Sequence, residues 1–203
     1  MITRIRLRRL VIFACAVAGF LAMAFFQAAT AQENLAVIYH PDPDSPPGER
    51  NPDGAAELAQ FEFLIGNWDV EVTYYGPDGN AINYKAEFHN IWIVDGLVIF
   101  QEWRGPYTTG AEFRSYDKKS NTWPGNNFYP GRGWWAAESV WDKNKRQMVV
   151  TSKKTDQRGE AINKEIYFDI TSSSFKIRSE ASYDKGETWE RGTFELTAKK
   201  RNS

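Results

Sequence analysis

The feature that most constrains the fold is an alternation of apolar and polar side chains that begins after Gly66. Trp68, Val70 and Val72 alternate with polar neighbours, which is typical of a strand with one buried face. Turn-forming clusters then recur at short intervals and separate ten strand candidates; they lie at residues 76–79, 95–96, 105–110, 117–121, 130–133, 142–145, 156–159, 171–174 and 184–186. A meander this long tends to close, because closure removes its exposed edges. The sequence therefore predicts an all-β domain, a single antiparallel up-and-down β-barrel of about ten strands.

Two of the ten candidates are irregular. Residues 123–129 contain Pro124 and Gly125, and residues 146–154 alternate poorly, so eight or nine strands is the alternative. The clearest strands are 162–170 and 175–183, each with one mainly apolar and one polar face. Since eight strands leave room for side chains or one small ligand, ten strands favour an interior cavity over a solidly packed barrel.

A short helix and a tether precede the barrel. Leu58 and Phe61 fall at helical spacing within 54–63, Leu64 continues that spacing, and Asp53 is the expected N-cap. Residues 32–54 contain five prolines in a polar stretch, which predicts a Pro-rich flexible tether. The barrel domain is accordingly expected to span residues 55–203.

The first 31 residues have the pattern of a secretory signal peptide. Four arginines at positions 4, 6, 8 and 9 precede an apolar run over 10–26, and a small-x-small site ends at Ala31. We expect cleavage between Ala31 and Gln32 and a secreted or periplasmic protein that meets the membrane only transiently, through this segment. An uncleaved anchor is the competing interpretation, because 17 apolar residues just reach the length of a membrane span.

Composition excludes several classes of function. Removing the four arginines of the signal leaves 21 Lys and Arg against 26 Asp and Glu, a net charge of −5, which argues against a nucleic-acid partner. The only cysteine, Cys15, leaves with the signal, so disulfides and thiol chemistry are excluded from the mature chain. No nucleophile elbow, phosphate-binding loop or dinucleotide fingerprint occurs. Residues 40–44, His-Pro-Asp-Pro-Asp, lie in the tether, and we predict neither a metal nor a cofactor.

The run Gly66-Asn67-Trp68 resembles the Gly-x-Trp opening of the lipocalin and calycin families. The resemblance implies that Trp68 closes one end of the barrel, with a basic side chain from the last strand over its ring. Lys199, Lys200 and Arg201 are placed to supply that side chain, and we assign it to Arg201. Gly66, Trp68 and Arg201 are therefore expected to form a structural end-cap.

Three longer segments resemble the DUF1579-like bacterial proteins, a family of unknown function. They are Phe61-Glu-Phe-Leu-Ile-Gly-Asn-Trp-Asp-Val, the Asp95-Gly96 hairpin leading to Phe100-Gln-Glu-Trp103, and Ser182-Tyr-Asp-Lys-Gly-Glu-Thr-Trp189. The resemblance implies a calycin-like barrel and transfers no catalytic residue. The related nitrobindin-like proteins hold haem through a histidine near the C-terminus, where this chain has none, so haem is not expected.

The last of these segments also matches the Asp-box of sialidases. Asp184 is expected to accept hydrogen bonds from turn amides, Gly186 to supply a positive φ, and Trp189 to pack under the turn. A single copy in so short a chain predicts a structural turn and not a sialidase.

Aromatic and ionisable side chains of the middle strands are the candidates for ligand binding. They are Gln101, Glu102, Trp103, Arg114, Trp134, Trp135 and Glu138. The first hypothesis is a protein that binds a small apolar or amphipathic ligand inside the barrel. The alternatives are an enzyme acting on a small molecule or carbohydrate, with Glu102 or Glu138 as acid–base and Arg114 as anion anchor, and an envelope protein that acts through its outer surface.

Overall fold

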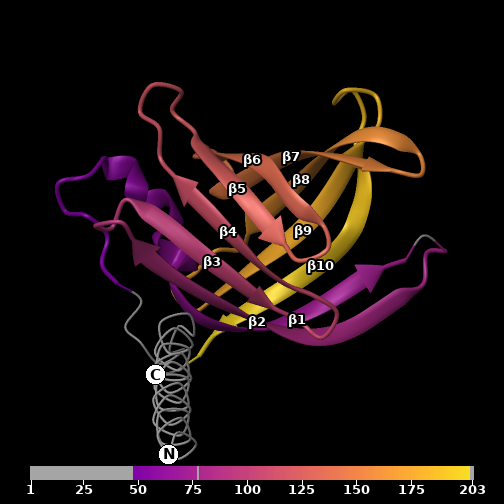
Figure 1. Ribbon diagram of the computed structural model, residues 1–203, viewed down its shortest axis with the longest axis horizontal. Coiled ribbons are helices and arrows are strands. Elements are labelled where there is room, and N and C mark those ends of the chain that lie inside the picture. Colours follow the sequence, from indigo (N-terminus) through magenta and orange to yellow (C-terminus); the bar gives the residue numbers. More distant parts are fainter. Residues whose placement is uncertain (1–47, 77, 202–203) are drawn as a thin grey trace, which may run out of the picture. The chain divides into compact units, whose positions relative to one another are not determined.

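The computed structural model describes residues 48–76 and 78–201. They form a closed barrel of ten strands with one short helix, η1 (Figure 1). The elements are η1 Ala56–Leu64, β1 Gly66–Tyr75, β2 Ala81–Ile93, β3 Val98–Arg104, β4 Thr109–Ser115, β5 Trp123–Tyr129, β6 Gly133–Asp142, β7 Gln147–Asp156, β8 Gly159–Phe168, β9 Ser174–Ser182 and β10 Glu190–Lys200.

Every strand pairs antiparallel with its neighbours in the sequence, and β10 pairs with β1 to close the barrel. The predicted fold class is thereby confirmed, and both irregular segments are strands, β5 and β7. Pairing of β5 with β4 runs from Phe128 to Gly125 and ends before Pro124. The missing N–H of Pro124 therefore costs no hydrogen bond to β4.

Closure divides each strand into an inward and an outward face. Phe88 of β2 contacts Phe175 of β9, with ring centroids 6.3 Å apart. Two strands, β1 and β10, separate β2 from β9 around the barrel, so these rings meet through the interior. On β8 the inward residues are Asn163, Glu165 and Tyr167, whereas the apolar face with Ile162 points outward. The interior of the barrel is consequently partly polar.

The helix η1 closes one end of the barrel. Leu58, Phe61 and Leu64 are buried, and their spacing of three suits the 3₁₀ helix that is observed. The Leu64 carbonyl accepts hydrogen bonds from Trp68 Nε1 and Asn90 Nδ2, both at 2.8 Å. Ala55, and not the predicted Asp53, occupies the N-cap position, and no side chain caps the helix.

The Trp68 end-cap forms with a different basic residue from the one expected. Lys200 Nζ lies 5.4 Å from the centroid of the Trp68 ring, because Lys200 is the register partner of Trp68 across β1 and β10. Arg201, one residue further, instead bonds Asp69 at 2.7 Å and also pairs with Glu87. Gly66 has φ +121°, and a Cβ there would lie 2.9 Å from Lys200 Cε, so this position favours glycine.

The last residues of the predicted tether pack on the barrel. Asn51 N and Asn51 Nδ2 donate to the carbonyls of Gly96 and Asp95 in the turn between β2 and β3, at 3.1 and 2.9 Å. Asn51 thus ties the last part of the predicted tether to the barrel by one backbone and one side-chain hydrogen bond. Residues 32–47 and the predicted signal peptide lie outside the described residues. Within those residues no helix has the length and apolarity needed to cross a membrane.

We predict that the plug made by η1 is a main source of stability. Phe61 is fully buried, packs edge-on against Trp123 at 4.9 Å and lies under Arg114. Phe61→Ala should lower the free energy of unfolding by ~3–5 kcal/mol in urea titrations, because it leaves a cavity. Exposed Glu62 on the same helix provides the control, and Glu62→Ala should cost less than ~1 kcal/mol. Equal decreases in the free energy of unfolding for the two variants would contradict the stabilising role of η1.

Candidate functional site

A row of polar side chains crosses the inner wall of the barrel. Register pairs join Asn90 to Gln101, Gln101 to Glu112, Glu112 to Asn127 and Asn127 to Trp135, over β2 to β6. The first four are buried, and Trp135 is half-buried. Since buried polar groups are costly unless they are paired, such a row calls for specific partners.

Arg114 and Glu112 form the centre of this inner polar cluster. Both are buried, and Arg114 Nη2 donates to Glu112 Oε2. The Tyr129 hydroxyl donates to Glu112 Oε1 at 3.2 Å, and the Arg114 guanidinium lies over the Phe61 ring at 4.9 Å. The carboxylate of the ion pair thus has a second hydrogen bond and the guanidinium packs on an aromatic ring. These contacts offset part of the free-energy cost of burying two charges.

Glu165 reaches the same cluster from β8, on the opposite wall. Burial and the nearby Glu112 carboxylate raise the pKa of Glu165 to about 8, although Arg114 opposes the shift. At neutral pH the side chain is therefore mainly an uncharged carboxylic acid. It nevertheless keeps some accessible surface. Glu165 is therefore partly accessible, although its carboxyl group lies among the buried groups of the cluster.

Two aromatic residues complete the polar cluster. Burial raises the pKa of Tyr129 and of Tyr167, so both phenols stay protonated. Tyr129 also stacks on Trp135 at 5.3 Å, which brings the predicted Trp135 to the cluster's edge. We define the inner polar cluster as Gln101, Glu112, Arg114, Asn127, Tyr129, Glu165 and Tyr167.

Some polar atoms in the interior have no partner. Among the described residues, the buried side-chain atoms without a hydrogen bond are Asn90 Oδ1, Trp92 Nε1, Gln101 Oε1 and Arg114 Nη1. Gln101 and Arg114 are 1% and 4% exposed, so bulk solvent does not satisfy them. An unsatisfied buried donor or acceptor costs roughly 1–3 kcal/mol. By hydrogen-bond geometry the cluster presents an unpaired donor, Arg114 Nη1, and an unpaired acceptor, Gln101 Oε1, while the Tyr167 phenol also interacts with the Arg114 guanidinium.

The other side of the interior is apolar. Inward residues of β1, β2, β9 and β10 are almost all aliphatic or aromatic and buried; they include Trp68, Val70, Val72, Ala86, Phe88, Phe175, Ile177, Leu196 and Ala198. The barrel interior thus joins an apolar wall to a polar wall. A molecule with both kinds of surface would match it.

Four of the seven candidates predicted for the site lie on the inner face of the barrel. Gln101, Trp103, Arg114 and Trp135 point inward. Glu102, Trp134 and Glu138 point outward, because each follows or precedes an inward residue on its strand. Their outward placement shows in the partners they take. Glu102 pairs with Arg104 at 2.7 Å, Trp134 is 64% exposed, and Glu138 accepts from Thr122 Oγ1 at 3.2 Å.

An acid–base site built on Glu102 or Glu138 with Arg114 is therefore wrong, since the barrel wall lies between these side chains. Sequence reasoning missed Glu112 and Glu165, the carboxylates that do reach Arg114. The sequence signal that could have identified them is a spacing of two residues along a strand, which places side chains on the same face. Glu112 lies two residues before Arg114 on β4, and Glu165 lies two residues before Tyr167 on β8.

The segment matching the Asp-box forms a compact turn. Asp184 accepts hydrogen bonds from Thr188 Oγ1 at 2.5 Å, from Thr188 N at 2.9 Å and from Ser182 Oγ at 2.7 Å, which hold its pKa well below the usual range. Gly186 has φ +96°, and its carbonyl accepts from Trp189 Nε1 at 3.2 Å. These bonds close the turn on itself, as expected for a structural element.

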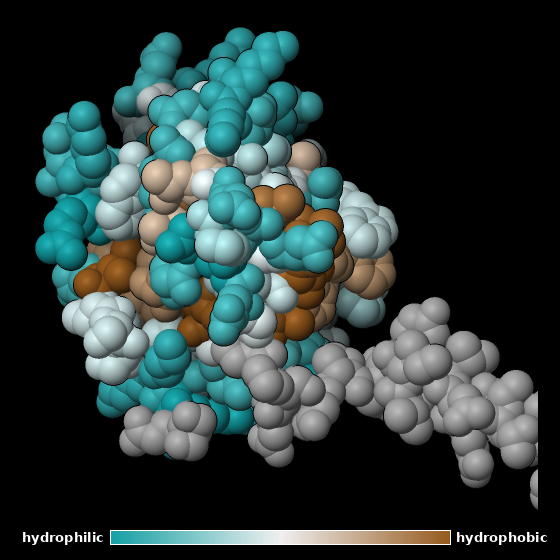
Figure 2. Space-filling view, turned by 90° about the vertical axis from the view of Figure 1, so that its left-hand side faces the viewer, coloured by the Kyte–Doolittle hydropathy of each residue, from teal (hydrophilic) through white to brown (hydrophobic). Residues whose placement is uncertain are grey.

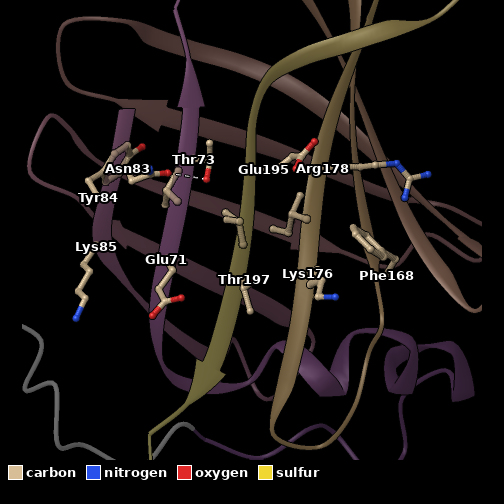
Figure 3. Close-up of a pocket in the computed structure, with 13 residues that line it drawn as sticks. Glu71, Thr73, Asn83, Tyr84, Lys85, Phe168, Lys176, Arg178, Glu195 and Thr197 are labelled. Atoms are coloured by element: carbon tan, nitrogen blue, oxygen red, sulfur yellow. Dashed lines mark hydrogen bonds between the residues drawn. The ribbon is translucent and has the colours of Figure 1, made fainter. Parts of the chain in front are cut away.

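Two grooves lie on the outside of the barrel. One of about 580 Å³ crosses β1, β2, β9 and β10 (Figure 3). Some of its polar groups have partners: Thr73 donates to Asn83 at 2.8 Å, and Lys176 pairs with Asp169 at 2.9 Å. The second, of about 970 Å³, is lined by outward residues of β3 to β8 such as Phe113 and Ile162.

The most exposed large apolar side chains are distributed over separate elements. Tyr107, Trp134 and Val94 lie in the β3–β4 turn, in β6 and in the β2–β3 turn. Figure 2 shows the side that is at the left in Figure 1, where apolar patches alternate with polar side chains. These three side chains therefore do not form one continuous apolar patch.

No group of three or more His, Cys, Asp or Glu side chains within residues 48–76 and 78–201 is placed to hold a metal ion. No family model and no curated protein matches the chain. Among solved structures, the crystal structure of Rv2717c from M. tuberculosis aligns with a TM-score of 0.52 at 9% identity, over 74% of this chain and 100% of that one. The S-type phycobiliprotein lyase CPES from Guillardia theta aligns with a TM-score of 0.47 at 10% identity, over 74% and 99%. The likeness to Rv2717c supports the barrel fold and nothing finer.

We predict that Glu165 makes stability depend on pH. Its pKa is about 8 in the folded chain against 4.5 for the free group, so the folded state binds more protons between these values. The contribution is fully present below pH 4.5 and is lost as the pH rises through 8. Only the wild type loses this contribution when the pH is raised from 5 to 9. The free energy of unfolding of Glu165→Gln relative to that of the wild type should therefore increase over this range by on the order of a few kcal/mol.

Urea titrations at the two pH values measure this difference. Glu138→Gln removes an exposed carboxylate from the outer face and serves as the control, with a change below ~0.5 kcal/mol at either pH. A parallel pH dependence in wild type and Glu165→Gln would show that Glu165 titrates normally.

Proposed function

We propose that this is an exported protein that binds a small amphipathic ligand inside its barrel. The observation that carries the proposal is the inner polar cluster, which faces an apolar wall and holds a free donor on Arg114 and a free acceptor on Gln101. Export is supported by the signal-like pattern of residues 1–31. The Phe61–Val70 run supports a relationship to the DUF1579-like proteins as part of the same proposal.

The two walls suit the two parts of such a ligand. Phe88, Phe175 and Ile177 offer aromatic and aliphatic surface to an apolar chain or ring, and its burial is worth about 25 cal/mol per Å². The polar part then lies against the inner polar cluster, where it satisfies atoms that folding leaves unpaired. The end opposite η1 is the expected entrance, because inward residues near it, such as Trp135 and Asn163, stay half-buried.

We predict that filling the interior abolishes binding. Ala137 points inward on β6, between the register partners Gly125 and Ser152, and Ala136 beside it points outward. Ala137→Phe should weaken binding of 1-decanol at least tenfold, because the new ring occupies the ligand's space. Ala136→Phe adds the same ring outside and should leave the affinity unchanged. The change in intrinsic tryptophan emission on titration measures both affinities, with far-UV circular dichroism to verify folding.

The opposite pattern would overturn the proposal. Ala136 lines the larger outer groove. A loss of affinity in Ala136→Phe with none in Ala137→Phe would place the ligand on the outer surface, and no binding to the wild type would remove support for an amphipathic site.

A further inference from the structure

We infer that the barrel selects a ligand whose polar head is uncharged and both donates and accepts hydrogen bonds, as an alcohol or a primary amide does. The inference rests on the proposed interior site and specifies its ligand class. It is carried by the arrangement of charges and unpaired atoms on the polar wall.

The charges of the inner polar cluster already balance. The positive charge of Arg114 is neutralised by the Glu112 carboxylate in a direct ion pair, and both side chains are buried. The other carboxyl group of the cluster, Glu165, interacts with Glu112 and Arg114 and is mainly protonated at neutral pH, as are Tyr129 and Tyr167. Since the cluster is neutral, a charged head would enter without a counter-charge, and burying an unpaired charge is expensive.

Both kinds of charged head meet specific opposition. A carboxylate approaching Arg114 would also approach Glu112, and it would compete with an ion pair that is already formed. An ammonium group could be neutralised only by ionising Glu165, beside the Glu112 carboxylate that raises its pKa. In either case the electrostatic cost makes the binding free energy less favourable, so a charged ligand binds more weakly.

An uncharged head, in contrast, matches the unpaired atoms. Arg114 Nη1 is a buried donor, and Gln101 Oε1 is a buried acceptor. They extend from β4 and β3, and Gln101 is the register partner of Glu112, two residues from Arg114 on the same face. Diagonal neighbours on paired strands lie about 7–8 Å apart, close enough for one small group to bridge between long side chains. A hydroxyl or amide supplies the missing acceptor and donor together.

The first test compares heads on a constant decyl chain. Decanoate, decylamine, 1-decanol and decanamide are titrated into the wild-type protein at pH 7, with tryptophan fluorescence as the readout. We expect the alcohol and the amide to bind at least about tenfold more tightly than the acid and the amine. Tighter binding of decanoate or decylamine than of 1-decanol would overturn the inference and leave interior binding intact. Failure of all four to bind would contradict the proposed function itself.

The second test removes the free acceptor. Gln101→Leu keeps a side chain of similar size without polar atoms. We expect it to weaken 1-decanol binding about tenfold, since the hydroxyl loses its acceptor, and to leave decyl methyl ether unchanged, since an ether donates no hydrogen bond. Equal effects on the alcohol and the ether would show that Gln101 only shapes the site. If Gln101→Leu does not fold, the head-group series on the wild-type protein still decides the question.

Discussion

The pairing of β10 with β1 is the constraint on which the rest of this structure depends. Its seven register pairs, from Trp68–Lys200 to Tyr74–Phe194, turn an open meander into a barrel. Closure gives every strand an inner face that water reaches only through the ends, and η1 covers one end. It also brings β4 and β8 across from each other, although more than 40 residues separate Arg114 from Glu165 in the sequence. The polar cluster exists only because the barrel closes.

Much of the fold could be predicted from local sequence. Alternation around Trp68 and Val70, together with recurring turn residues, predicted about ten strands in the observed order and left only the irregular β5 and β7 open. Details that depend on tertiary register were not predicted. The cation over Trp68 is Lys200 instead of Arg201, because a shift of one residue moves a side chain to the other face. Likewise, Leu58, Phe61 and Leu64 suited either an α-helix or the observed 3₁₀ helix.

The candidate site was predicted only in part, for a related reason. Alternation shows that a strand has two faces but does not show which one points inward. On β3, Gln101 shares the inner face with the apolar Ile99 and Trp103, an alternation that is visible in the sequence. On β8 the more apolar face points outward, and the inward Glu165 resembled a solvated charge. Glu102 and Glu138 were chosen for their chemistry, and strand geometry places them outside.

The central claim is that the interior holds a ligand. Native mass spectrometry of the protein purified from the cells that produce it tests this claim most directly. The account predicts a discrete added mass that stays through gentle ionisation and is lost on denaturation, with a composition that combines an apolar body and an uncharged polar head. A bare polypeptide mass under the same gentle conditions, for protein taken directly from its own compartment, would contradict it.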